Sequence, residues 1–211
     1  MGVLFRLIIV SPEYSIDHET ELVSQLFDRG LDCFHLRKPD WNEKQLDDYI
    51  QSIPVRFYHR IVIHSHFQLA SKYRLKGIHL NEEKKILIKA IELEFPSQKI
   101  ISASFHSLEE LEKNVYPFEY VFLGPVFDSI SKPGYSSAFD RKLLLERFQL
   151  WNQEHRILPK VIALGGVNAL NVSLTKELGF SGAALLGAVW ESKDPLNEFP
   201  KIHSKISDLV N

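Results

Sequence analysis

The chain has 211 residues, of which 45% are hydrophobic and 25% are charged, and its formal net charge is −2. This length suits one α/β barrel domain, and the near-neutral charge argues against a nucleic-acid partner. The only cysteine, Cys33, excludes a disulfide within the chain and indicates a reducing compartment.

The apolar N-terminal segment, residues 3–10, contains Arg6 and is too short to span a bilayer. No small-residue cleavage site follows it, as a signal peptide would require. We therefore interpret the segment as a first strand, and we expect a cytoplasmic protein without a membrane partner.

One pattern then repeats along the chain: a short apolar run, polar residues, and an amphipathic stretch. The expected strands are residues 4–10, 33–36, 61–63, 77–80, 99–102, 120–123, 160–163 and 182–186. The expected helices are residues 19–29, 43–53, 68–73, 86–94, 108–114, 141–154, 172–178 and 196–209. Expected helix starts are at Asp17, Asn42, Ser107, Asp140 and Asn171, with Ser107 and Glu110 forming a capping box, and Gly30 and Gly179 mark helix ends.

Eight buried strands that alternate with eight helices predict a single (β/α)8 TIM barrel, occupying residues 1–211 as one domain. The alternative is an open doubly wound sheet. That fold would normally place a glycine-rich phosphate fingerprint after the first strand, where this chain has Ser11-Pro12-Glu13-Tyr14.

Histidines gather at the expected strand ends, where barrel enzymes place their chemistry. They are His35, His64, His66, His79 and His106. A lone histidine of this kind would be explained by packing, but a cluster at one rim favours proton exchange near neutral pH. His106 stands just before a capping box, so the helix N-terminus should disfavour its imidazolium form and keep it a neutral acid or base. The alternative is a histidine that only packs at the helix entry.

Glycines follow the seventh and eighth expected strands, in Leu164-Gly165-Gly166 and Leu186-Gly187. Glycine lets backbone N–H groups approach a phosphate, and these two loops are the recurrent phosphate site of the barrel fold. We therefore expect Gly165, Gly166, Leu186 and Gly187 to bind a phosphate.

About 17 residues, 124–140, separate the sixth strand from its helix. Such loops are usually 2–6 residues long, and longer ones are commonly functional lids. The hydroxyls of Ser129 and Ser131 with the amine of Lys132 favour an anion-binding lid. The alternative is a surface loop without a binding role.

Four motifs carry a resemblance to a known family. They are His35-Leu36-Arg37-Lys38, the run from Ser102 to Glu110, Gly124-Pro125-Val126-Phe127 with Ser129 and Lys132, and Ala163-Leu164-Gly165-Gly166-Val167. Their order and spacing resemble the thiamine phosphate synthase superfamily over nearly the whole chain. Its members join a thiazole phosphate to a pyrimidine pyrophosphate, or tautomerise the thiazole phosphate. The resemblance also suggests a homodimer.

The resemblance implies roles at matching positions. Gly166, Leu186 and Gly187 would hold the thiazole phosphate. Ser104, Ser129 and Lys132 would hold the pyrophosphate in a synthase, and Arg37 would contact the pyrimidine pyrophosphate. His35 and His64 stand where the synthase motifs have glutamine and asparagine, so we expect them to line the substrate site together with Ser131.

Two departures distinguish the branches of the superfamily. The synthase motifs supply two aspartates for Mg²⁺, and this chain has Ser65 and Lys84 at those positions. Mg²⁺ prefers hard oxygen ligands and would be repelled by a lysine, although Glu82 or Glu83 could supply a neighbouring carboxylate. The tautomerase branch, which the resemblance describes as lacking these aspartates and using the histidine at position 106, is closer. We therefore expect a thiazole tautomerase with His106 as its acid and base, no cofactor and no metal.

Three alternatives remain open. The first is a thiamine phosphate synthase that uses Mg²⁺. The second is a non-catalytic protein that binds a phosphorylated ligand. The third is a metal-dependent hydrolase, in which His64 and His66 form a His-x-His pair completed by His79 or His106.

Overall fold

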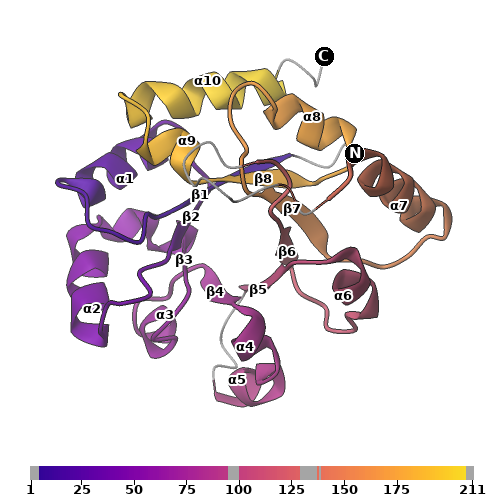
Figure 1. The fold of residues 1–211 in the computed structure, drawn as a ribbon. Coiled ribbons are helices and arrows are strands. Elements are labelled where there is room, and N and C mark those ends of the chain that lie inside the picture. Colours follow the sequence, from indigo (N-terminus) through magenta and orange to yellow (C-terminus); the bar gives the residue numbers. More distant parts are fainter. Residues whose placement is uncertain (1–4, 95–99, 129–136, 138, 208–211) are drawn as a thin grey trace. The chain divides into compact units, whose positions relative to one another are not determined.

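In the computed structural model, eight parallel strands close into one barrel in the order β1 to β8 (Figure 1). The structure describes residues 5–94, 100–128, 137 and 139–207. The strands are β1 (Arg6–Val10), β2 (Cys33–Leu36), β3 (Ile61–Ile63), β4 (Gly77–Leu80), β5 (Ile100–Phe105), β6 (Tyr120–Leu123), β7 (Lys160–Leu164) and β8 (Gly182–Leu185). The expected barrel is therefore confirmed.

Helices separate the strands along the chain. They are α1 (Glu19–Asp28), α2 (Glu43–Ser52), α3 (Gln68–Lys72), α4 (Glu82–Lys85), α5 (Ile88–Glu94), α6 (Leu108–Lys113), α7 (Arg141–Gln153), α8 (Val172–Glu177), α9 (Gly187–Trp190) and α10 (Pro195–Ser207), with a 3-10 helix η1 (Val55–Arg60). None of these helices, in the part of the chain that the structure describes, is long and apolar enough to cross a membrane.

The chain divides into two compact units. The first, the N-terminal unit, is Ile8–Ser104. The second, the C-terminal unit, is Phe105–Asn211 together with the chain up to Leu7. The expectation that the whole chain is one domain stays a prediction.

In the N-terminal unit, β2 pairs with both β1 and β3, and β4 pairs with β3 and β5. Every residue of β2, β3 and β4 is buried, as in strands covered on both faces. The helices α1 and α2 lie outside these strands (Figure 1), and each buries one apolar stripe, which includes Val23 and Leu26 on α1 and Leu46 and Ile50 on α2.

In the C-terminal unit, β7 pairs with β6 on one side and with β8 on the other. Figure 1 shows α8 and α10 side by side, and α8 contacts both α10 and β8. The ring of Phe148 on α7 lies 4.9 Å from the ring of Phe180, just before β8. Aromatic contacts of this kind fix the helices on the outside of the strands.

Local capping follows the sequence closely in three helices. The side chains of Asn42, Ser107 and Asp140 each accept a hydrogen bond from a backbone N–H of the first turn that follows. One further expectation was wrong, and one was confirmed in position only. The N-cap of α1 is His18, not Asp17, and it forms no side-chain cap bond. Asn171 does stand at the N-cap of α8 but forms no cap bond, because its oxygen accepts from the N–H of Asn168 instead.

Candidate functional site

In the C-terminal unit, the His106 side chain leaves the carboxyl end of β5 and is exposed. Its Nδ1 atom lies 3.0 Å from the carbonyl oxygen of Gly124, which follows β6. A carbonyl oxygen can only accept, so Nδ1 carries the proton in this hydrogen bond. In the neutral ring this leaves Nε2 as the unprotonated nitrogen. The backbone N–H of His106 also donates to Glu110, at 3.4 Å, which fixes the residue against the first turn of α6.

The glycine pair after β7 packs against the same segment that holds His106. A Cβ atom at Gly165 would lie 2.7 Å from the Cβ of Pro125, the residue after Gly124. A Cβ at Gly166 would lie 2.4 Å from the carbonyl oxygen of Asp128. Both glycines have positive φ, 93° and 66°, a backbone conformation that other residues rarely adopt. Close packing of two loops therefore requires both glycines, whatever ligand they bind.

The glycine after β8 begins a short helix. Gly187 is the first residue of α9, and Leu186 is its N-cap. The first N–H groups of a helix have no acceptor within it, so Gly187 and Ala188 present donors at the carboxyl end of β8. Gly165, Gly166, Leu186 and Gly187 are all partly exposed, which leaves their backbones accessible to a ligand.

The loop between β6 and α7 contains 17 residues, as expected. Hydrogen bonds join the two ends of this loop. The Ser137 N–H donates to Asp128 at 2.6 Å, and the Ser137 hydroxyl donates to the carbonyl of Val126 at 2.8 Å. Ser129, Ser131 and Lys132, the residues predicted to hold an anion, lie outside the described residues. Their proposed role stays a prediction.

In the N-terminal unit, three histidines meet at the carboxyl ends of β2, β3 and β4. They are His35, His64 and His79, and one ring nitrogen from each lies within 4.8 Å of the others. His35 Nδ1 is 3.0 Å from His64 Nε2, and the rings of His64 and His79 stack at 4.4 Å. His35 and His79 are completely buried, whereas His64 is partly exposed.

Burial keeps these three imidazoles neutral. Desolvation is the main cause that lowers the pKa of His79, to about 3, with added repulsion from Arg37 and Lys85. Desolvation likewise lowers the pKa values of His35 and His64 well below the ordinary value, and the neighbouring histidines lower them further. The three rings can therefore accept hydrogen bonds or bind a ligand without first losing a proton.

Two serines of β5 hold the His79 ring. The Ser102 hydroxyl donates to the carbonyl of Ile78, at 3.3 Å, and lies 2.8 Å from His79 Nδ1. Because that hydroxyl proton is engaged, Ser102 accepts from Nδ1–H. His79 Nε2 is then unprotonated and accepts from the Ser104 hydroxyl, at 2.8 Å. Ser104, predicted to bind pyrophosphate, is thus hydrogen-bonded to an imidazole.

The cations near this cluster are held by other groups. Arg37, predicted to bind a substrate, forms an ion pair with Glu13. Lys84 Nζ donates to the carbonyl of His64 at 2.8 Å and lies 4.8 Å from the ring of Phe67. Desolvation lowers the pKa of Lys84. A lysine amine thus lies beside the end of β3, where the magnesium site of the synthase alternative needs a carboxylate.

The residues present do not fit Mg²⁺. Glu82 and Glu83 both lie exposed in the first turn of α4. Within the described residues, the one group of three or more potential metal ligands consists of imidazoles and contains no carboxylate. Mg²⁺ prefers oxygen ligands in octahedral geometry, which this donor set does not supply.

The His-x-His pair of the metal-dependent hydrolase alternative is not formed. β3 ends at Ile63, so His64 and His66 lie beyond the strand, and the alternation of side chains along a strand does not apply to them. His66 has φ 50°, and its Nε2 lies 3.2 Å from the carbonyl oxygen of Trp41. His64 meets His35 and His79 instead.

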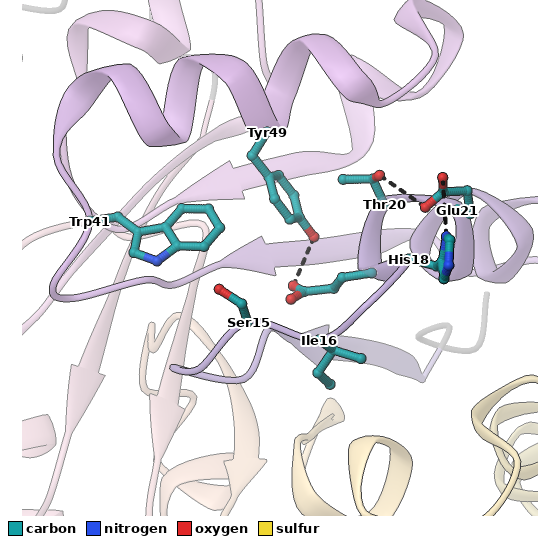
Figure 2. Close-up of a pocket in the computed structure, with 8 residues that line it drawn as sticks. Ser15, Ile16, His18, Thr20, Glu21, Trp41 and Tyr49 are labelled. Atoms are coloured by element: carbon teal, nitrogen blue, oxygen red, sulfur yellow. Dashed lines mark hydrogen bonds and ion pairs between the residues drawn. The ribbon is translucent and has the colours of Figure 1, made fainter.

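A cavity of about 210 Å³ lies beside the start of α1 (Figure 2). Its lining includes Trp41 and Tyr49, and the Tyr49 hydroxyl donates to the Glu19 carboxylate at 2.9 Å. On its other oxygen, Glu19 accepts from the buried Lys38 amine at 2.7 Å. This network was missed in the sequence, because its members are 19 to 30 residues apart and nothing local to Glu19 marks it as buried. The network fixes the loop after β2 against α1.

Comparisons with known proteins agree with this architecture. The thiamine-phosphate synthase of Desulfitobacterium hafniense is 25% identical over 201 residues, covering 92% of this chain and 94% of its own. The crystal structure of thiamine phosphate pyrophosphorylase from Bacteroides thetaiotaomicron has a TM-score of 0.76 at 30% identity and covers 98% of this chain and 100% of its own. The corresponding protein from Pyrococcus furiosus, at 20% identity, has a TM-score of 0.77, covers 98% of both chains and supports the fold.

The family model described as thiamine monophosphate synthase, TMP-TENI, matches residues 7–189. This range includes every strand of the barrel except the first residue of β1. It also contains His106, both glycine loops and the histidine cluster. The chain therefore belongs to the thiamine monophosphate synthase (TMP-TENI) family.

Proposed function

We propose that this member of a thiamine-biosynthesis family isomerises a thiazole phosphate by proton transfer at His106, without a divalent metal. The observation that carries the proposal is the hydrogen bond from His106 Nδ1 to the Gly124 carbonyl. It selects the tautomer in which the exposed ring presents an unprotonated Nε2, and a neutral imidazole of this kind can accept a proton and return it.

The reaction needs no other reactant. Nε2 would remove a proton from the saturated ring carbon of the substrate, and that C–H bond breaks as its electrons move through the conjugated system. A new C–H bond then forms at a second carbon with the proton held by the imidazolium, which returns the ring to its neutral form. The hydrogen bond to Gly124 would stabilise the transient imidazolium, because Nδ1 remains a donor throughout.

The glycine loops would anchor the phosphate. Gly165 packs on Pro125, and its neighbour Gly124 accepts from His106, so the β7 loop and the imidazole contact two adjacent residues of one segment. The partly exposed backbone of Gly166 and the start of α9 at Gly187 offer N–H donors for an anion. Binding at the phosphate would hold the substrate in one orientation, with its reacting carbon close to the imidazole.

The second candidate is thiamine phosphate synthesis, and the names of the relatives favour it. Both the curated relative at 25% identity and the structure at 30% identity carry the synthase or pyrophosphorylase name. That reaction requires charge neutralisation on the departing pyrophosphate, which a metal ordinarily supplies. The Lys84 amine beside the His64 carbonyl counts against Mg²⁺ at this position. As a cation, the same amine would itself neutralise part of the charge on a departing pyrophosphate.

Two assays on the same purified protein separate these candidates. The first follows isomerisation of a thiazole phosphate tautomer, and the second follows its coupling to hydroxymethylpyrimidine pyrophosphate, each with excess Mg²⁺ or with EDTA. We expect isomerisation at equal rates in both buffers and no coupling. Coupling that requires Mg²⁺, without isomerisation, would establish the synthase instead. Tight binding of the thiazole phosphate with neither reaction would identify a binding protein.

A further inference from the structure

The histidine cluster of the N-terminal unit is not used by the reaction proposed above. The carboxyl ends of three adjacent strands bring His35, His64 and His79 together, with one nitrogen of each ring within 4.8 Å of the others. We infer that these three imidazoles form a binding site for one transition-metal ion of the zinc class.

The spacing of the rings is close to that of a metal site. In a tetrahedral zinc site with Zn–N bonds of about 2.0–2.1 Å, two ligand nitrogens lie about 3.4 Å apart. His35 Nδ1 and His64 Nε2 are already 3.0 Å apart. The ring of His35 lies 5.2 Å from that of His64 and 5.1 Å from that of His79. Small side-chain rotations, with a shift of one ring to its other neutral tautomer, would direct all three lone pairs at one point.

The outer partners of His79 match those of a metal ligand. Metal-binding histidines almost always donate their second ring N–H to a fixed acceptor, which sets the tautomer and the ring orientation. His79 Nδ1–H donates to Ser102, and Ser102 is itself oriented by its bond to the carbonyl of Ile78. The unprotonated Nε2 then points to Ser104, whose hydroxyl could rotate away when a metal binds.

The donor set selects the class of metal. Imidazole suits Zn²⁺, Co²⁺, Ni²⁺ and Cu²⁺, whereas Mg²⁺ and Ca²⁺ require oxygen ligands. Three protein ligands leave a fourth position of a tetrahedral ion to water or to a small ligand. The site therefore differs in both residues and metal from the magnesium site that the synthase motifs would supply.

Positive charges around the histidine cluster disfavour the binding of a metal cation, so removing one of them tests the inference. Positive charges on Arg37, Lys76, Lys84 and Lys85 act on the three histidines. Arg37 is paired with Glu13, whereas Lys84 donates to the backbone of His64, one of the proposed ligands. Replacing Lys84 by methionine should keep the packing on Phe67 and tighten metal binding by roughly 10-fold or more, since a repelling charge is removed.

Metal binding can be read directly, independently of catalysis. The full-length protein is stripped with EDTA, exchanged into buffer and titrated with Co²⁺, while the visible absorption of tetrahedral cobalt is followed and Zn²⁺ is used as competitor. We expect one ion per chain, displaced by Zn²⁺. His79→Gln should weaken binding more than about 100-fold, and Ser102→Ala should weaken it about 10- to 100-fold.

His66→Gln is the matched control, because His66 follows the same strand but bonds to Trp41. It should bind cobalt like the unaltered protein. His64→Gln, at the partly exposed ligand, supplies a second test if His79→Gln does not fold. The inference is overturned if the unaltered protein shows no saturable cobalt spectrum, if His66→Gln loses binding as strongly as the ligand variants, or if Lys84→Met weakens binding.

Discussion

The amine of Lys84 donates a hydrogen bond to the backbone carbonyl of His64, with 2.8 Å between Nζ and the oxygen. This contact joins Lys84 of α4 to His64, the residue before Ser65. Ser65 and Lys84 are the positions at which the synthase motifs would supply aspartates. It puts a cation next to the position that Mg²⁺ would occupy in a synthase, and it supports the proposal that this protein works without Mg²⁺.

Restoring carboxylates at these positions should restore a magnesium site. The double variant Ser65→Asp, Lys84→Asp supplies two oxygen ligands and removes the amine. We expect it to bind Mg²⁺ with a dissociation constant on the order of 1 mM in a calorimetric titration. The uncharged variant Ser65→Asn, Lys84→Asn should show no binding. Magnesium binding by the unaltered protein would contradict the role given to Lys84.

The stability of the fold should fall as the pH drops below about 6.5. His79 has a folded-state pKa of about 3, below its ordinary value, so the unfolded chain binds a proton that the folded chain does not. The contribution of His79 to the free energy of unfolding is fully present above the pKa of the unfolded chain, and it decreases as the pH falls toward 3. Between pH 6.5 and pH 5, His79 alone should cost about 2 kcal/mol of unfolding free energy.

Urea unfolding in EDTA at a series of pH values measures this effect. His79→Gln should have a shallower loss of stability on acidification, because one titrating group is gone. His59→Gln, at an exposed histidine, should keep the slope of the unaltered protein. Equal slopes in all three proteins would show that the His79 ring is not buried as a neutral group.

Adding a methyl group at Gly166 should damage both stability and substrate binding. The Cβ of Gly166→Ala would meet the carbonyl oxygen of Asp128 at 2.4 Å, and φ is already positive. We expect a loss of roughly 1–3 kcal/mol in unfolding free energy, with a raised KM, because the loops must separate. Gly30→Ala is the control: it has the same sign of φ but nothing within 4 Å, so it should cost less and leave KM unchanged.

Removing one partner of the buried ion pair between Lys38 and Glu19 should strongly lower the stability of the protein. Lys38→Met leaves a buried carboxylate that retains the Tyr49 hydroxyl as a donor. Breaking such a pair costs about 3–5 kcal/mol. Lys44→Met, which removes an exposed ion pair with Asp48, should leave the urea midpoint unchanged. Similar midpoints for both variants would mean that the Lys38 amine is solvated in the folded protein.

The strands were predictable because their buried apolar runs are bounded by polar residues, and the bounds of β2, β3, β4 and β6 agree with the sequence analysis. The short helices were not predictable in the same way. α4 and α9 have four residues each, too few for a periodic pattern, and α4 falls between the expected strand 77–80 and the expected helix 86–94. His18 took the N-cap of α1 through a left-handed backbone, which no residue type at that position indicates.

The candidate site was predictable where its groups are local and unpredictable where they are not. The glycines themselves indicated a special loop at Gly165 and Gly166. The cap at Ser107 indicated that His106 lies just before a helix. The partner of His106, the Gly124 carbonyl, is 18 residues away and required the structure. The alternative pairing of His64 with His66 was wrong because it applied strand alternation to residues beyond Ile63, where the expected strand already ended.

The central claim is that His106 transfers the proton without a divalent metal. The most direct measurement is deuterium uptake from D₂O into a thiazole phosphate, followed by NMR in EDTA for the unaltered protein and His106→Gln, with binding of the phosphate measured in parallel. We predict that His106→Gln slows exchange about 10²- to 10⁴-fold while binding is retained. Equal exchange rates for the two proteins, or exchange that appears only when Mg²⁺ is added, would contradict the account.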